Sequence, residues 1–166
     1  VSITVTNAND APTATRQAVT TAEDTPVAIT LAGTDPENDA LTFAIASGPA
    51  NGTLSGIAPG LTYTPTANFS GSDSFTFTVT DGTATSAPAT VSITVTATND
   101  GPTATPQAVT TAEDTPVAIT LAGTDPENDG LGFRVAGGAS KSRRSGSAPH
   151  LTYTTTANFS GADSFT

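Results

Sequence analysis

The sequence contains no cysteine, no methionine and no tryptophan, and only 5% of its 166 residues are aromatic. Without cysteine the chain can form neither a disulfide framework nor a thiolate zinc site. No apolar run approaches the roughly 18 residues that cross a bilayer as a helix, so we expect no membrane insertion. These absences suit an exported bacterial protein that avoids oxidation chemistry, although they do not fix the compartment.

Positive charge is also scarce. Five lysine and arginine residues stand against 15 aspartate and glutamate residues, which gives a net charge of −10. Because nucleic-acid binding depends on lysine and arginine neutralising phosphates, this balance argues against a nucleic-acid partner. It argues equally against binding to an anionic membrane surface. Charged residues make up only 12% of the chain, so the acids are concentrated in few places.

The chain repeats itself when it is shifted by 90 positions, so that residue 1 falls on residue 91. The segment 17–39 returns unchanged at 107–129. A period of this length corresponds to a whole small domain. The sequence opens and stops in mid-pattern, so we expect it to be a fragment of a longer array. We predict the last strand of a preceding repeat at 1–8, a complete repeat at 9–98, and an incomplete repeat at 99–166 that lacks its last two strands.

Apolar and polar residues alternate along the complete repeat, in runs that include Ile29, Phe43, Phe77 and Ile93. Such alternation, rich in β-branched and aromatic residues, is typical of strands with one buried face. Turn signals such as Asn-Gly and Asp-Gly separate the runs. About seven short strands per repeat predict an all-β fold of tandem immunoglobulin-like antiparallel β-sandwiches.

Tyrosine and phenylalanine recur at equivalent positions in the two copies. Tyr63 and Tyr153 are in phase with neighbouring leucines, so we expect them at the edge of the core rather than in a sugar-binding platform. Phe69 and Phe159 are expected to close one end of the core.

The segment Thr-Asp-Pro-Glu-Asn-Asp occurs at 34–39 and again at 124–129, and each copy places three carboxylates within five residues. Oxygen-only ligands suit Ca²⁺, which takes about 6–8 of them. An EF-hand is excluded, because position twelve of the second loop is Ala136 and no helices flank it. Other ligands would have to come from elsewhere in the fold. The alternative interpretation is a polar loop that maintains solubility.

Three segments carry a more specific resemblance: "AEDTPVAITLAGTDPENDALTFAI" at 22–45, "SFTFTVTDG" at 74–82 and "VSITVTATNDGP" at 91–102. Together they resemble the cadherin-like tandem repeats of large secreted bacterial surface adhesins. In that family a first-strand acid, an Asp-x-Asp loop, an acid before the final hairpin and an Asn-Asp linker bind calcium between successive domains.

The resemblance implies calcium ligands at the matching positions of this chain. At the junction between the repeats these are Glu23, Asn99, Asp100, Asp125 and Glu127. The remaining matches and loop acids are Asn9, Asp10, Asp35, Glu37, Asp39, Asp81, Glu113 and Asp129. The linker contains fewer acidic residues than the family pattern. Asp73 stands alone where that pattern has an Asp-Glu pair. These departures imply fewer ions per junction or weaker binding.

The sequence contains few residues in patterns typical of a catalytic site. The one histidine is His150, and the equivalent position of the first copy is Gly60, which makes a general base in the repeat a poor hypothesis. Paired carboxylates serve glycosidases, but the sequence predicts no aromatic-lined groove. We predict that the chain is not an enzyme.

The segment 136–150 departs from its counterpart at 46–60 and gathers four of the five basic residues in or beside it. Two apolar positions are lost, because Leu54 and Ile57 correspond to Arg144 and Ser147. We expect a damaged segment that behaves as a mobile loop. The alternative is a basic patch for an acidic partner.

These observations predict a calcium-binding structural spacer in an extracellular adhesin on the bacterial cell surface. Its partners would be neighbouring repeats of the same polypeptide, while other domains would contact a cell-surface glycan or protein. The alternative is an adhesion module that binds carbohydrate or protein through its own loops. A further alternative is strand exchange between molecules, because 1–6 duplicates 91–96. The absence of the preceding strand weighs against it.

Overall fold

The computed structural model describes residues 1–4 and 8–166. The chain divides into two compact units, unit 1 (Val1–Thr98) and unit 2 (Asn99–Thr166), and each is described by itself. The described residues form strands and turns without a helix. Accordingly, this part of the chain offers no helical segment of the length and hydropathy that crossing a membrane requires.

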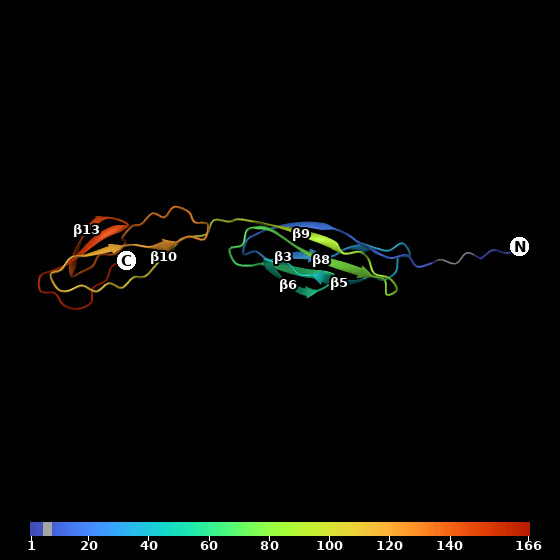
Figure 1. Ribbon diagram of the computed structural model, residues 1–166, viewed down its shortest axis with the longest axis horizontal. Helices are drawn as coiled ribbons and strands as arrows, with labels where there is room; N and C mark the ends of the chain where they lie inside the picture. Colours follow the sequence, from blue (N-terminus) through green and yellow to red (C-terminus); the bar gives the residue numbers. More distant parts are fainter. Residues whose placement is uncertain (5–7) are drawn as a thin grey trace. The chain divides into compact units, whose positions relative to one another are not determined.

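Unit 1 is built from two main sheets whose strands run along the length of the unit (Figure 1). One sheet has the order β2-β9-β8-β5, the other has the order β3-β7-β6, and β1 pairs with β4. The strands are β1 (Thr13–Ala14), β2 (Gln17–Ala22), β3 (Val27–Thr30), β4 (Gly33–Thr34), β5 (Thr42–Ser47), β6 (Gly52–Ile57), β7 (Gly60–Pro65), β8 (Gly71–Thr80) and β9 (Ala89–Thr96). The predicted all-β sandwich is therefore confirmed. All pairs are antiparallel except β2–β9, which is parallel, and the alternation pattern does not predict strand direction.

The core of unit 1 lies between its two sheets. On β8 and β9 each inward position is buried, while the intervening serines and threonines face outward. Burying such apolar side chains is the main favourable term in folding. The opposite sheet contributes buried side chains to the same cluster, among them Ile29, Leu61 and Tyr63. Phe69 packs against this cluster, as the sequence predicts.

The last strand of a preceding repeat, predicted at 1–8, stays a prediction and lies only partly within the described residues. Residues 1–4 have no strand conformation, and the side chains of Val1 and Ile3 are exposed. Positions 5–7 of the predicted strand lie outside the described residues. A strand is stabilised by its neighbours in a sheet, and 1–4 pair with no other strand described in the chain.

Unit 2 repeats the smaller sheet of unit 1. Its strands are β10 (Thr103–Ala104), β11 (Val117–Thr120), β12 (Gly123–Thr124), β13 (Ser142–Ser147) and β14 (His150–Thr155). The order β11-β14-β13 matches β3-β7-β6, and Val117 is paired with Tyr153 as Val27 is with Tyr63. In contrast, 107–112 is not a strand although its sequence is identical to β2. Leu151 is the one buried apolar side chain among the described residues of unit 2.

The expectation of a mobile loop at 136–150 is wrong for 142–150, because β13 pairs with β14 in the register of β6 with β7. Residues of the hairpin turn are shared between the copies, including Gly146 at φ 94°, which matches Gly56 at φ 95°. Ile57 is 88% exposed, so its replacement by serine in unit 2 removes nothing from the core. Arg144, in place of Leu54, lays its guanidinium 4.9 Å from the ring centroid of Phe165, a favourable cation–π contact.

Candidate functional site

Predicted ligand positions from three separate segments meet at one place in unit 1. The backbone amide of Asp10 donates a hydrogen bond to Glu37 Oε2 at 3.0 Å. The side-chain amide of Asn9 donates to Asp81 Oδ2 at 3.0 Å. We call this group, together with Asp35, the N-terminal acid cluster. The fold thus joins the Asn-Asp pair, the acidic loop and the late acid of the repeat.

The acidic loop of unit 1 folds around the carboxylate of Asp35. Oδ1 of Asp35 accepts hydrogen bonds from the amides of Glu37 at 2.9 Å and Asp39 at 3.0 Å. Asn38 lies between them in the left-handed region at φ 61°, which asparagine tolerates better than most residues. Oδ2 of Asp35 is buried and has no hydrogen-bond partner among residues 1–4 and 8–166. A buried oxygen without a partner is costly, so it is a candidate ligand atom.

Asp81 closes the turn that follows β8. Its Oδ1 accepts hydrogen bonds from the amides of Ala84 at 2.7 Å and Thr83 at 2.6 Å. These bonds, with a smaller contribution from Asn9, lower the pKa of Asp81 below its ordinary value. Asp81 is therefore a fixed, ionised carboxylate in the N-terminal acid cluster.

Unit 2 forms the same arrangement from its identical loop sequence. The amide of Asp100 donates to Glu127 Oε2 at 3.1 Å. Oδ1 of Asp125 accepts from the amides of Glu127 and Asp129, both at 3.1 Å. The side-chain amide of Asn99 donates to the carbonyl of Asp100. We call these residues the linker acid cluster.

Glu23 lies at the other end of unit 1 from the N-terminal acid cluster. Its amide donates to the carbonyl of Thr96, where β9 ends, and its Oε1 accepts from the amide of Thr98. Asp81 follows the end of β8, which is antiparallel to β9, so Glu23 and Asp81 flank opposite ends of the same strand pair. Glu23 is buried, whereas Glu113, its counterpart in unit 2, is exposed.

No metal centre is formed in the described part of the chain. Residues 1–4 and 8–166 contain no group of three or more histidine, cysteine, aspartate or glutamate side chains arranged to hold an ion. The carboxylates in both clusters instead accept hydrogen bonds from backbone amides. The ligand set derived from the resemblance therefore stays a prediction.

A buried polar network was not predicted from the sequence. Asp73 accepts hydrogen bonds from the hydroxyl of Tyr63 at 2.8 Å and from the amides of Ala50 and Asn51, both at 2.9 Å. Tyr63 is 0% exposed, so it lies in the middle of the core and not at its edge. Asp73 therefore holds the core of unit 1 together. A signal for this pairing exists, because Tyr and Asp recur ten residues apart in unit 2.

The network shifts the pKa values of both partners. Desolvation by burial acts to raise the pKa of Asp73, but the hydrogen bonds from Ala50, Tyr63, Asn51 and Ser74 together outweigh it and lower the pKa. Burial, followed by the hydrogen bond and the charge of Asp73, raises the pKa of Tyr63. Asp73 is therefore held as an anion and Tyr63 as a neutral donor.

This network predicts acid sensitivity. The folded-state pKa of Asp73 lies below its ordinary value of 3.8, so its contribution to stability is present above that value and is lost as the pH falls through the folded pKa. We expect the melting temperature of unit 1 to fall below about pH 4. The fall should be smaller in Asp73→Asn, as calorimetry at stepped pH would measure. An unchanged acid profile in the variant would contradict the assignment.

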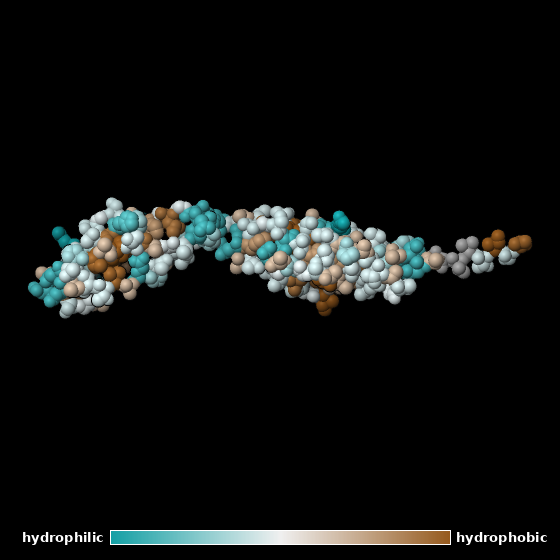
Figure 2. Space-filling view, viewed as in Figure 1, coloured by the Kyte–Doolittle hydropathy of each residue, from teal (hydrophilic) through white to brown (hydrophobic). Residues whose placement is uncertain are grey.

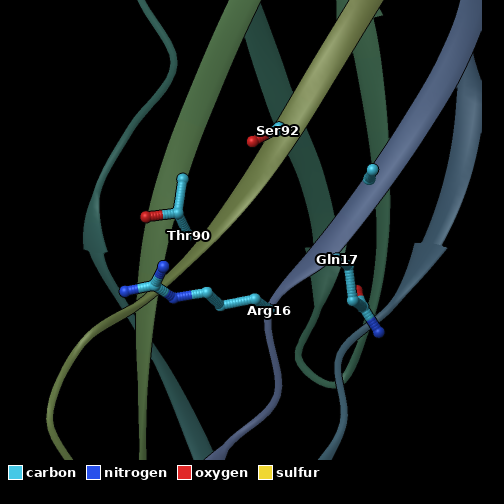
Figure 3. A pocket seen from close by; sticks show the side chains of 5 residues that line it. Arg16, Gln17, Thr90 and Ser92 are labelled. Atoms are coloured by element: carbon cyan, nitrogen blue, oxygen red, sulfur yellow. The ribbon is translucent and has the colours of Figure 1, made fainter.

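A shallow polar pocket of about 530 Å³ lies on unit 1 and is lined by Arg16, Gln17, Ala18, Thr90 and Ser92 (Figure 3). The side-chain amide of Gln17 is already engaged with the carbonyl of Thr30. None of the lining residues is aromatic, so the pocket offers no ring for stacking on a sugar. In the second copy Pro106 stands in place of Arg16.

Comparison with known proteins defines the family. The bacterial Ig domain family matches residues 9–94 and again 99–166, so the chain belongs to this family and contains two of its repeats. No curated protein matches the sequence. The predicted resemblance to a bacterial cadherin-like, immunoglobulin-like repeat is thus confirmed.

Two solved cadherin structures support the fold. Extracellular cadherin domains 3–6 of protocadherin gamma B2 match 88% of this chain at 16% identity and a TM-score of 0.52. The extracellular domain of protocadherin gamma B4 matches 92% of it at 22% identity, also with a TM-score of 0.52. An endo-fucoidan hydrolase of glycoside hydrolase family 107 matches 97% at 24% identity and a TM-score of 0.46. The chain spans 39%, 28% and 27% of these structures, respectively.

Proposed function

We propose that this chain is a non-catalytic spacer from an extracellular bacterial surface protein, in which Ca²⁺ stiffens the junctions between successive repeats. Its direct partners would be the neighbouring repeats of the same polypeptide. Bacterial Ig domains are commonly repeats of extracellular surface proteins. The absence of cysteine agrees with a fold that needs no disulfide chemistry after export.

The observation that carries this proposal is the recurrence of one oxygen-rich arrangement in both units. In each, an acidic loop wraps an aspartate Oδ1, and its glutamate binds the amide of an Asn-Asp segment. Carboxylate, amide and backbone carbonyl oxygens are the ligands that Ca²⁺ prefers. The partnerless Oδ2 of Asp35 supplies a buried anionic oxygen that an ion would satisfy. The donor set therefore fits calcium.

The position of the acids also favours a role at repeat ends. Glu23 binds the amide of Thr98, at the end of unit 1, and Glu127 binds the amide of Asp100, near the start of unit 2. Acidic side chains are thus attached to the chain on both sides of Asn99. The Ca²⁺ ligands at this junction would be Glu23, Asn99, Asp100, Asp125 and Glu127, with Asp129 in the same loop. A bound ion would neutralise the repulsion among these carboxylates.

The residues offer little to catalysis. His150 is exposed on β14, and its Nδ1 contacts the hydroxyl of Thr120 at 3.3 Å. Gly60 occupies the equivalent position of unit 1. Asp73, whose pKa is lowered by its hydrogen bonds, is buried in the core rather than in a cleft, and a shifted pKa suggests a catalytic role only where substrate can reach the group. We therefore assign the chain a structural role.

Calcium titration by calorimetry tests the proposal. We expect saturable binding with a Kd on the order of 10⁻⁴ to 10⁻³ M, as in other extracellular calcium modules. The double variant Asp100→Asn with Glu127→Gln should lose the ion of the linker acid cluster. The matched control is Asp114→Asn, since Asp114 is an exposed acid that caps the amide of Asn158. Equal binding by all three proteins, or none by the wild type, would contradict the proposal.

A further inference from the structure

The outer face of the sheet β11-β14-β13 in unit 2 carries basic side chains. Because Leu151 on β14 is buried, His150 and Thr154 lie on the opposite, outward face of the strand. Arg143 is paired with Thr154 in the sheet and lies on the same face. Lys141 is two residues before Arg143, so alternation places it there as well. Lys141, Arg143 and His150 are all exposed, and we call this surface the basic face.

The potential at the basic face is positive although the chain as a whole is acidic. The three strands have the sequences VAIT, SRRSGS and HLTYTT, and none of these contains an acidic residue. Among the described residues no carboxylate forms an ion pair with Lys141 or Arg143. The net charge of the chain is −10, but at physiological ionic strength charges beyond about 8 Å are largely screened. A partner that touches this face therefore meets cations.

The equivalent face of unit 1 is uncharged. The strands β3, β6 and β7 have the sequences VAIT, GTLSGI and GLTYTP, without a charged residue. Pale colours, midway on the hydropathy scale, dominate the side of unit 1 that is visible in Figure 2. Three neutral residues of unit 1 are replaced by basic residues in unit 2: Asn51 by Lys141, Thr53 by Arg143, and Gly60 by His150. The basic face thus belongs to one unit, and the other unit provides an internal comparison.

The hairpin of β13 and β14 does not need these cations in order to form. Its register is that of β6 with β7. The carbonyl of Lys141 accepts a hydrogen bond from the amide of Thr156 at 3.0 Å, just as the carbonyl of Asn51 accepts one from the amide of Thr66 at 2.9 Å. The same backbone is therefore built with either set of side chains, and the charges of Lys141 and Arg143 are left for a partner.

We propose that the basic face binds an acidic polysaccharide, that is, a chain of sugars that carry carboxylate or sulfate groups. Arginine donates two parallel hydrogen bonds to a carboxylate or a similar oxyanion, and lysine adds a compact point charge. Lys141 and Arg143 are two residues apart, roughly 7 Å along an extended chain, so they can contact separate anionic groups of one polymer. Exposed hydroxyl groups of Ser145 and Ser147 lie on the same strand and can bond to sugar hydroxyls.

Other partners fit this face less well. The hydroxyl of Tyr153 is directed to Asp163 on the inner side of the sheet, so the basic face has no phenol ring for stacking on a neutral sugar. The acidic loops of a second copy of the chain are a poor match, because the carboxylate of Asp125 already accepts hydrogen bonds from the amides of Glu127 and Asp129. A polymer whose anionic groups are unengaged is the better complement. This binding goes beyond the spacer role and does not require calcium.

The test is biolayer interferometry of the 166-residue chain on immobilised dextran sulfate and alginate, with neutral dextran as the control polymer. We expect saturable binding to one or both acidic polymers and none to dextran, and the preferred polymer tells sulfate from carboxylate. Excess chelator keeps calcium out of the measurement, so a failure here is distinct from a failure of the calcium proposal. Raising NaCl from about 50 mM to about 500 mM should weaken binding at least 10-fold or so, since the contacts are exposed and ionic.

Variants of the basic face separate it from the other cations of the chain. Lys141→Asn with Arg143→Thr restores the residues of unit 1, so the hairpin should fold, and we expect binding to weaken roughly 10-fold. The matched control is Arg16→Gln with Arg134→Gln. It removes the same charge from two exposed residues outside the sheet β11-β14-β13, and binding should be unchanged.

A gain-of-function variant provides an independent measurement. Asn51→Lys with Thr53→Arg should give unit 1 a basic face of its own and increase the amount of acidic polymer bound per chain. Absence of binding to both acidic polymers would overturn the proposal, as would equal binding by the two double variants that remove charge. Binding to poly-L-glutamate as strong as to the acidic polysaccharides would also overturn it, because the face would then select charge alone.

Discussion

Replacing Asp73 by alanine is expected to destabilise unit 1 by about 3–5 kcal/mol, because several charge-assisted hydrogen bonds are lost and buried donors remain. The carboxylate is 8% exposed. The amides of Ala50 and Asn51 would lose their acceptor, and the hydroxyl of Tyr63 would keep only its longer contact, 3.3 Å, with the carbonyl of Asn51. Hydrogen exchange read by mass spectrometry over unit 1 peptides would report the loss, since it resolves each unit separately.

Two comparisons separate this network from a general loss of packing. Tyr63→Phe removes one hydrogen bond and keeps the ring, so it should cost roughly 1–2 kcal/mol. Asp163→Ala, the equivalent change in unit 2, should cost less than Asp73→Ala, because Asp163 is only half-buried and water can reach the donors it leaves. A loss below about 1 kcal/mol in Asp73→Ala would contradict the role assigned to the network.

Substituting serine for Gly52 is expected to destabilise unit 1 by roughly 2–3 kcal/mol through overpacking. A Cβ at this position would clash with Cε2 of Tyr63, and it would lie 2.6 Å from Cζ of Tyr63 and 2.7 Å from the carbonyl oxygen of Thr64. That carbonyl belongs to β7, which pairs with β6 at this point, so the clash cannot be relieved by rotating a side chain. Urea denaturation followed by far-UV circular dichroism measures the effect.

The control for this substitution is Gly48→Ser, because a Cβ at Gly48 meets nothing within 4 Å. Unit 2 already has serine at the equivalent position. There, Ser142 Oγ donates to Asp163 Oδ2 at 3.0 Å, and the Tyr153–Asp163 hydrogen bond measures 3.1 Å against 2.8 Å in unit 1. If Gly52→Ser matched the stability of Gly48→Ser, the tight contact at Tyr63 would not limit this position.

The strands in which apolar and polar residues alternate strictly could be predicted from the sequence. Phe77 and Ile93 are buried as predicted, because period two puts every second residue on one face. The parallel pairing of β2 with β9 could not be predicted, since alternation reports faces and not strand direction. The β13–β14 hairpin could not be predicted either. Arg144 and Ser147 interrupt the apolar alternation there, although the turn residues, such as Gly146, are the same as in unit 1.

The sequence predicted part of the grouping of the candidate site residues. The resemblance placed Asp10, Glu37 and Asp81 in one group, and the fold does bring them together (Asp81 through Asn9). It also assigned Glu23 to the junction with Asn99 and Asp100, and in the fold Glu23 accepts a hydrogen bond from the amide of Thr98, at that end of unit 1. The buried hydrogen-bonding role of Asp73 could not be predicted, because an acidic residue looks the same in a sequence whether it holds the core together or binds a metal ion.

The most direct test of the central claim is thermal melting of the 166-residue chain in 10 mM Ca²⁺ and in excess chelator, at matched ionic strength. A ligand that binds only the folded state must raise the midpoint. With a Kd near 1 mM the account predicts a rise of roughly 5–10 °C. Identical midpoints in the two solutions would mean that the acid clusters hold no calcium, and the proposed stiffening of the junction would lose its cause.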